Sequence, residues 1–237
     1  MLPHRWPGRA FKAVLIARPN KFLALCQTHA GVRGQRAGAM VEAHVPDRGR
    51  CLDLLVPGRE VALVAASGPL RRTAFTCLLA RSSSGTWVSL DPAGAPRLVE
   101  EALRLNLLPG LEGKLVVRRE VTVGKSRIDL LLTGEMLCEV KSVGAAKDGL
   151  ALFPDAPTER GVRHVRLLTR LARTRPCAIV LCAQRVDVHA IAPDEAIDPE
   201  FAKALRKASR SGVSISGLRC SATLAGIQPL NSVPVIL

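Results

Sequence analysis

Three charged residues whose types and spacing could do chemistry lie within a mostly apolar stretch of the chain. Asp129 interrupts the run Arg-Ile-Asp-Leu-Leu-Leu, and Glu139 and Lys141 stand two residues apart in Cys-Glu-Val-Lys. Charged side chains are rarely buried unless they are paired or bind a metal ion. We therefore predict a metal-dependent site for phosphodiester chemistry at these residues.

The spacing of the two acids is that of a β-hairpin. If residues 133–135 form a three-residue loop, Leu132 pairs with Met136 and Asp129 pairs with Glu139. Residues directly opposite each other on antiparallel strands bring their Cβ atoms to about 5 Å on one face. Both carboxylates are therefore expected on the same face of the sheet.

Lys141 is expected on that face too, because side chains alternate along a strand. Two carboxylates this close repel unless a cation lies between them, and their hard oxygens suit Mg²⁺ or Mn²⁺. Lys141 would then orient or help to deprotonate the attacking water, or offset charge in the transition state. The alternative is an ordinary ion pair of Lys141 with Asp129 or with Glu139.

The elements that must position these residues have the pattern of an α/β domain. Apolar residues recur at helical spacing or in short runs between turn signals. One of these runs, 178–183, is apolar on both faces, as buried parallel strands are. The predicted elements are a helix over Arg97–Leu108, strands over Leu115–Val121, Arg127–Leu132 and Met136–Val140, a helix over Thr158–Arg173, a strand over Ala178–Ala183, a helix opening at Asp198-Pro199-Glu200 and a strand over Val213–Leu218.

The part of the chain before residue 91 reads as short strands separated by turn signals, which suggests a small antiparallel barrel. A boundary is expected near residues 91–96, giving a barrel domain over 1–92 and an α/β domain over 96–237. The predicted strands are Ala13–Arg18, Phe22–Gln27, Met40–Val45, Leu52–Leu55, Glu60–Ala66, Thr73–Leu79 and Thr86–Leu90, with one of the breaks at Ser67-Gly68-Pro69.

The chain is strongly basic, with a formal net charge of +14 at pH 7 over 237 residues. Residues 1–95 carry 13 Lys and Arg against 5 Asp and Glu, and the remainder carries 21 against 15. Since both parts are basic, the excess is no single charged tail. It favours a polyanionic partner, nucleic acid above all.

Other features limit the class of protein. No apolar run approaches the roughly 18 residues that a membrane span needs, and the start of the chain lacks the order of a signal peptide. The seven cysteines include no Cys-x-x-Cys pair, so we interpret them as reduced, buried thiols rather than zinc ligands. A cytoplasmic protein without a membrane partner is expected; the oligomeric state stays open, a homodimer included.

Five strings of residues, spread over nearly the whole chain, carry a resemblance to known proteins. They are Arg18-Pro19-Asn20-Lys21-Phe22, Gly124-Lys125-Ser126-Arg127-Ile128-Asp129, Glu139-Val140-Lys141-Ser142-Val143, Phe153-Pro154-Asp155-Ala156-Pro157-Thr158-Glu159-Arg160-Gly161 with His164, and Pro234-Val235-Ile236-Leu237. The pattern of an Asp and a Glu-x-Lys on consecutive strands behind a helix is similar to the core of the PD-(D/E)xK nuclease superfamily. More specifically, the strings resemble the sugar fermentation stimulation protein A family.

The resemblance implies an OB-like barrel followed by a PD-(D/E)xK nuclease-like α/β domain, with DNA as the partner. It matches Glu101, rather than its neighbour Glu100, to the acid of the first core helix, as a further metal ligand or a nearby support. It also places Glu120 where this acid would hold Arg127. The residues expected to contact nucleic acid are Asn20, Lys21, Arg50, Arg71, Arg72, Arg127 and Arg160.

Some interpretations stay open at this point. The site belongs either to a working nuclease or to a non-catalytic DNA-binding regulator of sugar-utilisation genes that keeps the nuclease fold; an RNA-binding module is a third, weaker reading. Thr158 either caps a helix or helps to bind a phosphate at its N-terminus. His164 either faces the site or is a core or surface histidine, and Phe22 and Trp87 are either a stacking platform or core residues.

Overall fold

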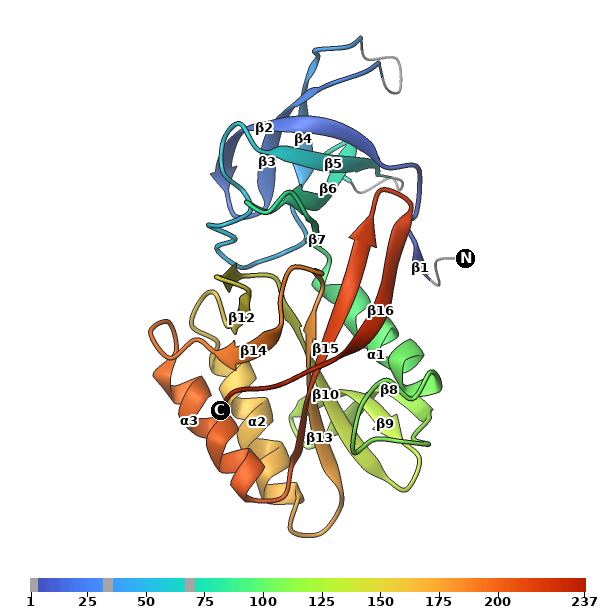
Figure 1. The fold of residues 1–237 in the computed structure, drawn as a ribbon, viewed down its shortest axis with the longest axis vertical. Coiled ribbons are helices and arrows are strands. Elements are labelled where there is room, and N and C mark those ends of the chain that lie inside the picture. Colours follow the sequence, from blue (N-terminus) through green and yellow to red (C-terminus); the bar gives the residue numbers. More distant parts are fainter. Residues whose placement is uncertain (1–3, 32–35, 67–70) are drawn as a thin grey trace. The chain divides into compact units, whose positions relative to one another are not determined.

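A computed structural model describes the chain except for residues 1–3, 32–35 and 67–70 (Figure 1). The predicted break at Ser67-Gly68-Pro69 therefore lies outside the described residues. The chain forms two compact units. The first comprises Met1–Pro92, Arg185–Asp187 and Ser221–Gln228, and the second comprises Ala93–Gln184, Val188–Cys220 and Pro229–Leu237. No helix of the described residues is long and apolar enough to cross a bilayer.

The first unit contains a closed barrel, as predicted. Its strands follow the order β4-β3-β2-β5-β6-β7, and a parallel pairing of β4 with β6 closes the sheet. Alternating side chains fill the interior, with Leu15, Leu63 and Cys77 fully buried. The strands are β2 (Phe11–Asn20), β3 (Leu23–Thr28), β4 (Met40–His44), β5 (Glu60–Ala65), β6 (Phe75–Arg81) and β7 (Trp87–Ser89).

The predicted strand over Leu52–Leu55 was wrong, because this segment forms a tight turn. The N–H groups of Leu54 and Leu55 both donate to the carbonyl of Cys51, at 3.1 and 2.8 Å. The turn directs Leu54 and Leu55 into the barrel and leaves Leu52 74% exposed. Burial of two consecutive side chains suits a helical turn, whereas a strand would place them on opposite faces.

Distant segments complete the first unit. β1 (His4–Arg5) pairs antiparallel with the start of β16 (Gly226–Val233). Trp6 Nε1 donates to the carbonyl of Thr223 at 2.8 Å. The buried guanidinium of Arg185 pairs with Asp187 at 2.7 Å and with Asp53 at 3.1 Å.

The second unit is built on a mixed sheet, in which its own strands follow the order β16-β15-β13-β10-β9-β8. β13 is parallel to both β10 and β15, and all seven of its residues are buried, as its apolar pattern predicted. The additional elements are α1 (Ala95–Arg104), β8 (Val116–Val123), β9 (Ser126–Leu132), β10 (Met136–Val143), β11 (Ala146–Lys147), β12 (Leu150–Phe153), α2 (Glu159–Leu171), β13 (Cys177–Ala183), β14 (Ala190–Pro193), α3 (Pro199–Arg210) and β15 (Ser214–Thr223).

Helices α2 and α3 lie side by side and share a common N-terminal anchor (Figure 1). Thr158 caps α2 by accepting from the N–H of Gly161 at 3.1 Å, and Asp198 caps α3 by accepting from the N–H of Phe201 at 2.9 Å. The second oxygen of Asp198 accepts from the N–H of Thr158 at 2.8 Å, which ties the two helix starts together. The capping interpretation of Thr158 is thereby confirmed.

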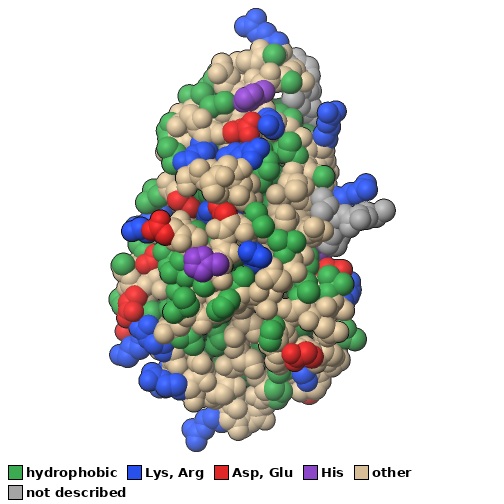
Figure 2. Space-filling model, viewed as in Figure 1, with side chains coloured by type: hydrophobic (Ala, Val, Ile, Leu, Met, Phe, Trp, Pro, Cys, Tyr) green, Lys and Arg blue, Asp and Glu red, His purple; other side chains and the backbone are tan. Residues whose placement is uncertain are grey.

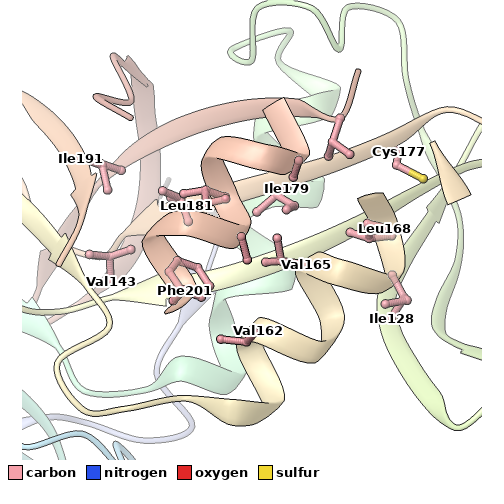
Figure 3. Packing of buried hydrophobic residues seen from close by; sticks show 14 of the residues in the cluster. Ile128, Val143, Val162, Val165, Leu168, Cys177, Ile179, Leu181, Ile191 and Phe201 are labelled. Carbon is pink, nitrogen blue, oxygen red and sulfur yellow. The ribbon is translucent and has the colours of Figure 1, made fainter. Parts of the chain in front are cut away.

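The core of the second unit lies between these two helices and the sheet (Figure 3). Val165 and Leu168 of α2 and Phe201 of α3 are fully buried against Ile179 and Leu181 of β13. This packing fixes the depth and rotation of α2 over the sheet. The side chains of α2 that point inward therefore meet the strand residues on the same face, including those of β10.

Candidate metal and nucleic-acid site

Glu139 is the centre of a buried polar cluster on β10. Its side chain is only 3% exposed, and its Oε1 atom lies 2.6 Å from both Lys141 Nζ and His164 Nδ1. His164 reaches it from α2, where the inward face of the helix packs on the sheet. The other oxygen, Oε2, is buried and has no hydrogen-bond partner in the described structure.

Asp129 reaches the same cluster from β9. The register pairs Leu132 with Met136, as the three-residue loop predicted, and the ladder of paired residues ends where Leu130 meets Cys138. Asp129 Oδ2 instead accepts a hydrogen bond of 2.7 Å from the backbone N–H of Val140. Its carboxylate thus stands at the point where β9 and β10 separate.

The two carboxylates have different electrostatic environments. Burial and the nearby charge of Glu139 raise the pKa of Asp129 to about 6, although the N–H of Val140 and the charges of Lys141 and His164 favour the ionised form. Burial also opposes ionisation of Glu139, but the contacts with His164 and Lys141 outweigh it and lower the pKa of Glu139. Asp129 is therefore the carboxylate that is less stable as an anion.

The cluster has part of what a divalent cation needs. Its free ligand atom is Glu139 Oε2, and a buried carboxylate oxygen without a donor gains from a cation. The predicted ion pair between Glu139 and Lys141 is also present. Within the described parts of the chain, no group of three His, Cys, Asp or Glu side chains is arranged to hold a metal ion.

The two adjacent acids of α1 differ in their surroundings. Glu100 is 9% exposed and pairs with Arg104 at 2.7 Å and, through Oε2, with Arg119. The side chain of Glu101 is 24% exposed and lies 3.5 Å from Arg104. Glu100 thus pairs with two arginines, whereas the ion pair of Glu101 among the described residues is the longer contact with Arg104.

Four of the residues expected to contact nucleic acid lie on the barrel near one groove of about 480 Å³. Asn20, Arg71 and Arg72 line it together with Phe22, whose ring is 43% exposed. Lys21 Nζ lies 5.1 Å from the centre of that ring. Trp87, by contrast, is 8% exposed and lies beneath Arg81, so it belongs to the barrel wall.

The other expected contacts are dispersed. Arg50 is exposed in the loop after β4, where Arg18 holds its carbonyl and that of Gly49. Arg127 on β9 pairs with Glu120 at 3.6 Å, as the family pattern implied, and both side chains are exposed. Arg160 is exposed in the first turn of α2.

Of the alternatives for His164, the structure shows the one in which it faces the site, since its Nδ1 atom contacts Glu139 Oε1 at 2.6 Å. The contact joins residues 25 positions apart and depends on how α2 packs, so the sequence alone did not decide between the alternatives. One feature was not predicted: the arginines that recur at three- and four-residue intervals on α2 lie next to a row of cations on α3.

Comparisons with known proteins identify the family of the chain. Residues 16–90 match the family described as the SfsA N-terminal OB domain, and residues 93–226 match the sugar fermentation stimulation protein RE domain. Sugar fermentation stimulation protein homologues from Chloroflexus aggregans and Moorella thermoacetica are 44% and 40% identical, over 95% and 90% of this chain and 85% and 91% of theirs.

A solved structure gives the same result at the level of the fold. It is described as the structure of Pyrococcus furiosus SfsA in complex with Ca²⁺, is 26% identical, and covers 100% of both chains with a TM-score of 0.86. The OB domain matched over residues 16–90, the second domain matched over 93–226 and relatives of 40% and 44% identity lead to one conclusion: the chain belongs to the sugar fermentation stimulation protein family.

Proposed function

We propose that this protein binds DNA and hydrolyses its phosphodiester bonds at a divalent-metal site built on Asp129 and Glu139. The observation that carries the proposal is the buried oxygen Oε2 of Glu139, which has no donor although its neighbour Oε1 has two. A buried carboxylate oxygen without a partner is costly. A cation shared with Asp129 would remove that cost and the repulsion between the two acids.

The identity of the cation follows from the ligands and the substrate. Carboxylate oxygens suit hard cations, and the related Pyrococcus furiosus protein is described in complex with Ca²⁺. We infer Mg²⁺ or Mn²⁺ as the working ion, because Mg²⁺ keeps several waters and takes phosphate oxygens as further ligands. Glu101 is the proposed further ligand or support, from α1. When bound, such an ion polarises a phosphoryl oxygen and lowers the pKa of a bound water.

The chain's own residues have distinct roles in this proposal. His164 holds Glu139 through Oε1 at 2.6 Å, which leaves Oε2 free to bind. The Nζ atom of Lys141, on a side chain that is 11% exposed, lies in the same cluster and would stabilise negative charge on a phosphodiester. The N–H of Val140 fixes the rotamer of Asp129. Each acid is thereby oriented before a substrate arrives.

DNA is the proposed polyanion because the chain is strongly basic and because the barrel carries a groove lined by cations and an aromatic ring. A net charge of +14 favours phosphate contacts. The groove offers Arg71 and Arg72 beside the exposed ring of Phe22, a combination that suits bases stacked on an aromatic ring next to a neutralised backbone.

The test is cleavage of labelled single- and double-stranded DNA with Mg²⁺, with Mn²⁺ and with chelator. The native protein should cleave only with metal, and Asp129→Asn should abolish cleavage. Asp148→Asn is the matched control, since Asp148 is exposed in the turn before β12. Metal-independent cleavage, or equal cleavage by Asp129→Asn, would contradict the proposed site.

A second candidate function is supported by a specific observation. Glu139 already contacts Lys141 and His164, and the described residues include no three-ligand metal group. A non-catalytic DNA-binding regulator of sugar-utilisation genes would show this closed cluster. DNA binding without cleavage, together with an unchanged melting temperature in Mg²⁺ or Mn²⁺, would favour the regulator.

A further inference from the structure

A groove of about 700 Å³ runs between the outer faces of α2 and α3, in the half nearer their C-termini. Arg170 and Arg173 line it from the α2 side, and Lys203 and Lys207 line it from α3. All four side chains belong to exposed residues. Figure 2 shows Lys and Arg side chains gathered along the edge where α3 runs in Figure 1.

The spacing of the cations follows the helices. On α2 and just beyond its end, Arg163, Arg166, Arg170 and Arg173 recur at intervals of three, four and three residues. On α3, Lys203 and Lys207 are four residues apart, or about 6 Å along the axis. Because the two helices start from a shared anchor, their cations form two adjacent rows.

One of the five cations that line the groove is neutralised by an acid. Arg166 lines the groove as well and pairs with Glu200 at 2.5 Å, toward the helix N-termini. For Arg170, Arg173, Lys203 and Lys207, the described structure contains no ion pair with an acidic side chain. Like charges four residues apart on one helix repel each other. The arrangement is therefore unfavourable by itself and favourable beside an anion.

Helix stabilisation explains only part of the arrangement. Cations in the last turn interact favourably with the negative end of the helix dipole, which suits Arg170 and Lys207. Lys203 lies in the middle of α3, where the dipole gives no such benefit, and Arg173 lies two residues beyond α2. The two rows thus extend further than the helix ends require.

We propose that the α2–α3 groove binds the phosphate backbone of double-stranded DNA. The identity of the polyanion rests on the function proposed above; the location is new, since every contact expected from the sequence except Arg160 lies outside these helices. Among the residues that the structure describes, the groove is lined by cations with Thr169, Ala204 and Ser211 and by no aromatic ring. Single-strand sites combine cations with aromatic rings, so this lining suits a duplex, whose bases are already stacked.

The test compares two full-length variants that each lose two arginines and two lysines. The groove variant carries Arg170→Gln, Arg173→Gln, Lys203→Gln and Lys207→Gln. The matched control carries Arg97→Gln, Arg118→Gln, Lys125→Gln and Lys147→Gln, at exposed positions of the same unit. Affinity for a random-sequence duplex is measured over a range of salt concentrations, with a single strand and phosphatidylserine vesicles as separate probes.

The expected result concerns the slope of log affinity against log salt. Each phosphate contact contributes about 0.9 to the steepness of this slope. The slope of the groove variant should therefore be shallower than that of the native protein by about 3 to 4, and the slope of the control by less than about 1. Circular dichroism should show both variants folded, with the groove variant at least as heat-stable as the native protein at low salt. If the groove variant loses heat stability while its salt slope is unchanged, the cations stabilise the helices rather than bind DNA, and the proposal is overturned.

Three further outcomes would also overturn it. Equal losses of slope in both variants would mean that the cations attract DNA diffusely rather than at the groove. A loss of affinity confined to the single strand would show that the groove does not bind duplex DNA. A loss confined to the vesicles would assign the groove to an anionic membrane surface. If the native protein itself fails to bind DNA, the proposed function fails with the inference. If the native protein binds and the groove variant matches it, the inference alone fails.

Discussion

Replacing Asp129 by Asn should stabilise the metal-free protein near neutral pH. The pKa of Asp129 rises from 3.8 to about 6 on folding, because the site is buried and Glu139 is close. At about 1.4 kcal/mol for each pH unit, this difference corresponds to at most about 3 kcal/mol. Asn keeps an oxygen that accepts from the N–H of Val140, so the hydrogen bond of 2.7 Å survives the change.

The sign of the effect follows from linkage. Since the folded-state pKa of Asp129 is raised, the stability that this residue contributes is complete below about pH 4 and is lost as the pH rises through about 6. Glu139 acts in the opposite direction, because its pKa is lowered in the fold and its contribution is lost in acid. Both proteins retain Glu139. The stability of Asp129→Asn relative to native should therefore rise between about pH 4 and about pH 7.

Urea unfolding followed by far-UV circular dichroism is the suitable assay. The helices α1, α2 and α3 all lie in the unit that contains Asp129, whereas both tryptophans lie in the other unit. The control is Asp148→Asn, at an exposed position whose φ of 50° Asn tolerates. This substitution should change the free energy of unfolding by no more than about 0.5 kcal/mol. If the difference in free energy of unfolding between the native protein and Asp129→Asn stays constant from pH 4 to pH 7, the electrostatic explanation is wrong.

Three other predictions follow from the proposed sites. Mg²⁺ or Mn²⁺ at about a hundred times its dissociation constant should stabilise the native protein by about 2.7 kcal/mol, and calorimetry should find this effect absent in Asp129→Asn. Lys141→Ala should keep the metal-induced rise in melting temperature but lose cleavage; loss of both would make Lys141 a structural residue. Phe22→Ala should weaken single-strand binding by about 1–3 kcal/mol, while Leu52→Ala, at a side chain 74% exposed on the same unit, should leave anisotropy titrations unchanged.

Local signals in the sequence were sufficient for several elements. The loop 133–135 set the register of Leu132 with Met136, since hairpin pairing depends on loop length. The apolar run of β13 indicated a buried parallel strand, and Asp198 before Pro199 indicated the start of α3. Each of these features is determined by residues that are close together in the chain.

Features that depend on distant residues could not be predicted in the same way. The contact between His164 and Glu139 depends on the rotation of α2 over the sheet, which the packing of Val165 and Leu168 determines. The short strands β11, β12 and β14 went unpredicted, because β12 finds its parallel partner about 40 residues away. Asp129 was predicted opposite Glu139, but its contact with the N–H of Val140 arises where the ladder ends.

The composition of the first unit has a consequence for the order of folding. The barrel core draws only on residues between Phe11 and Leu90, so it can assemble as soon as this stretch has been synthesised. Its contacts with later parts of the chain form only after those parts have been synthesised, because Trp6 bonds to Thr223 and Asp53 pairs with Arg185. Closing such long loops is slow relative to local pairing. During synthesis we therefore expect the barrel core to form early and the contacts with Thr223 and Arg185 to form last. A fragment ending at residue 92 would contain the barrel core but lack these two contacts.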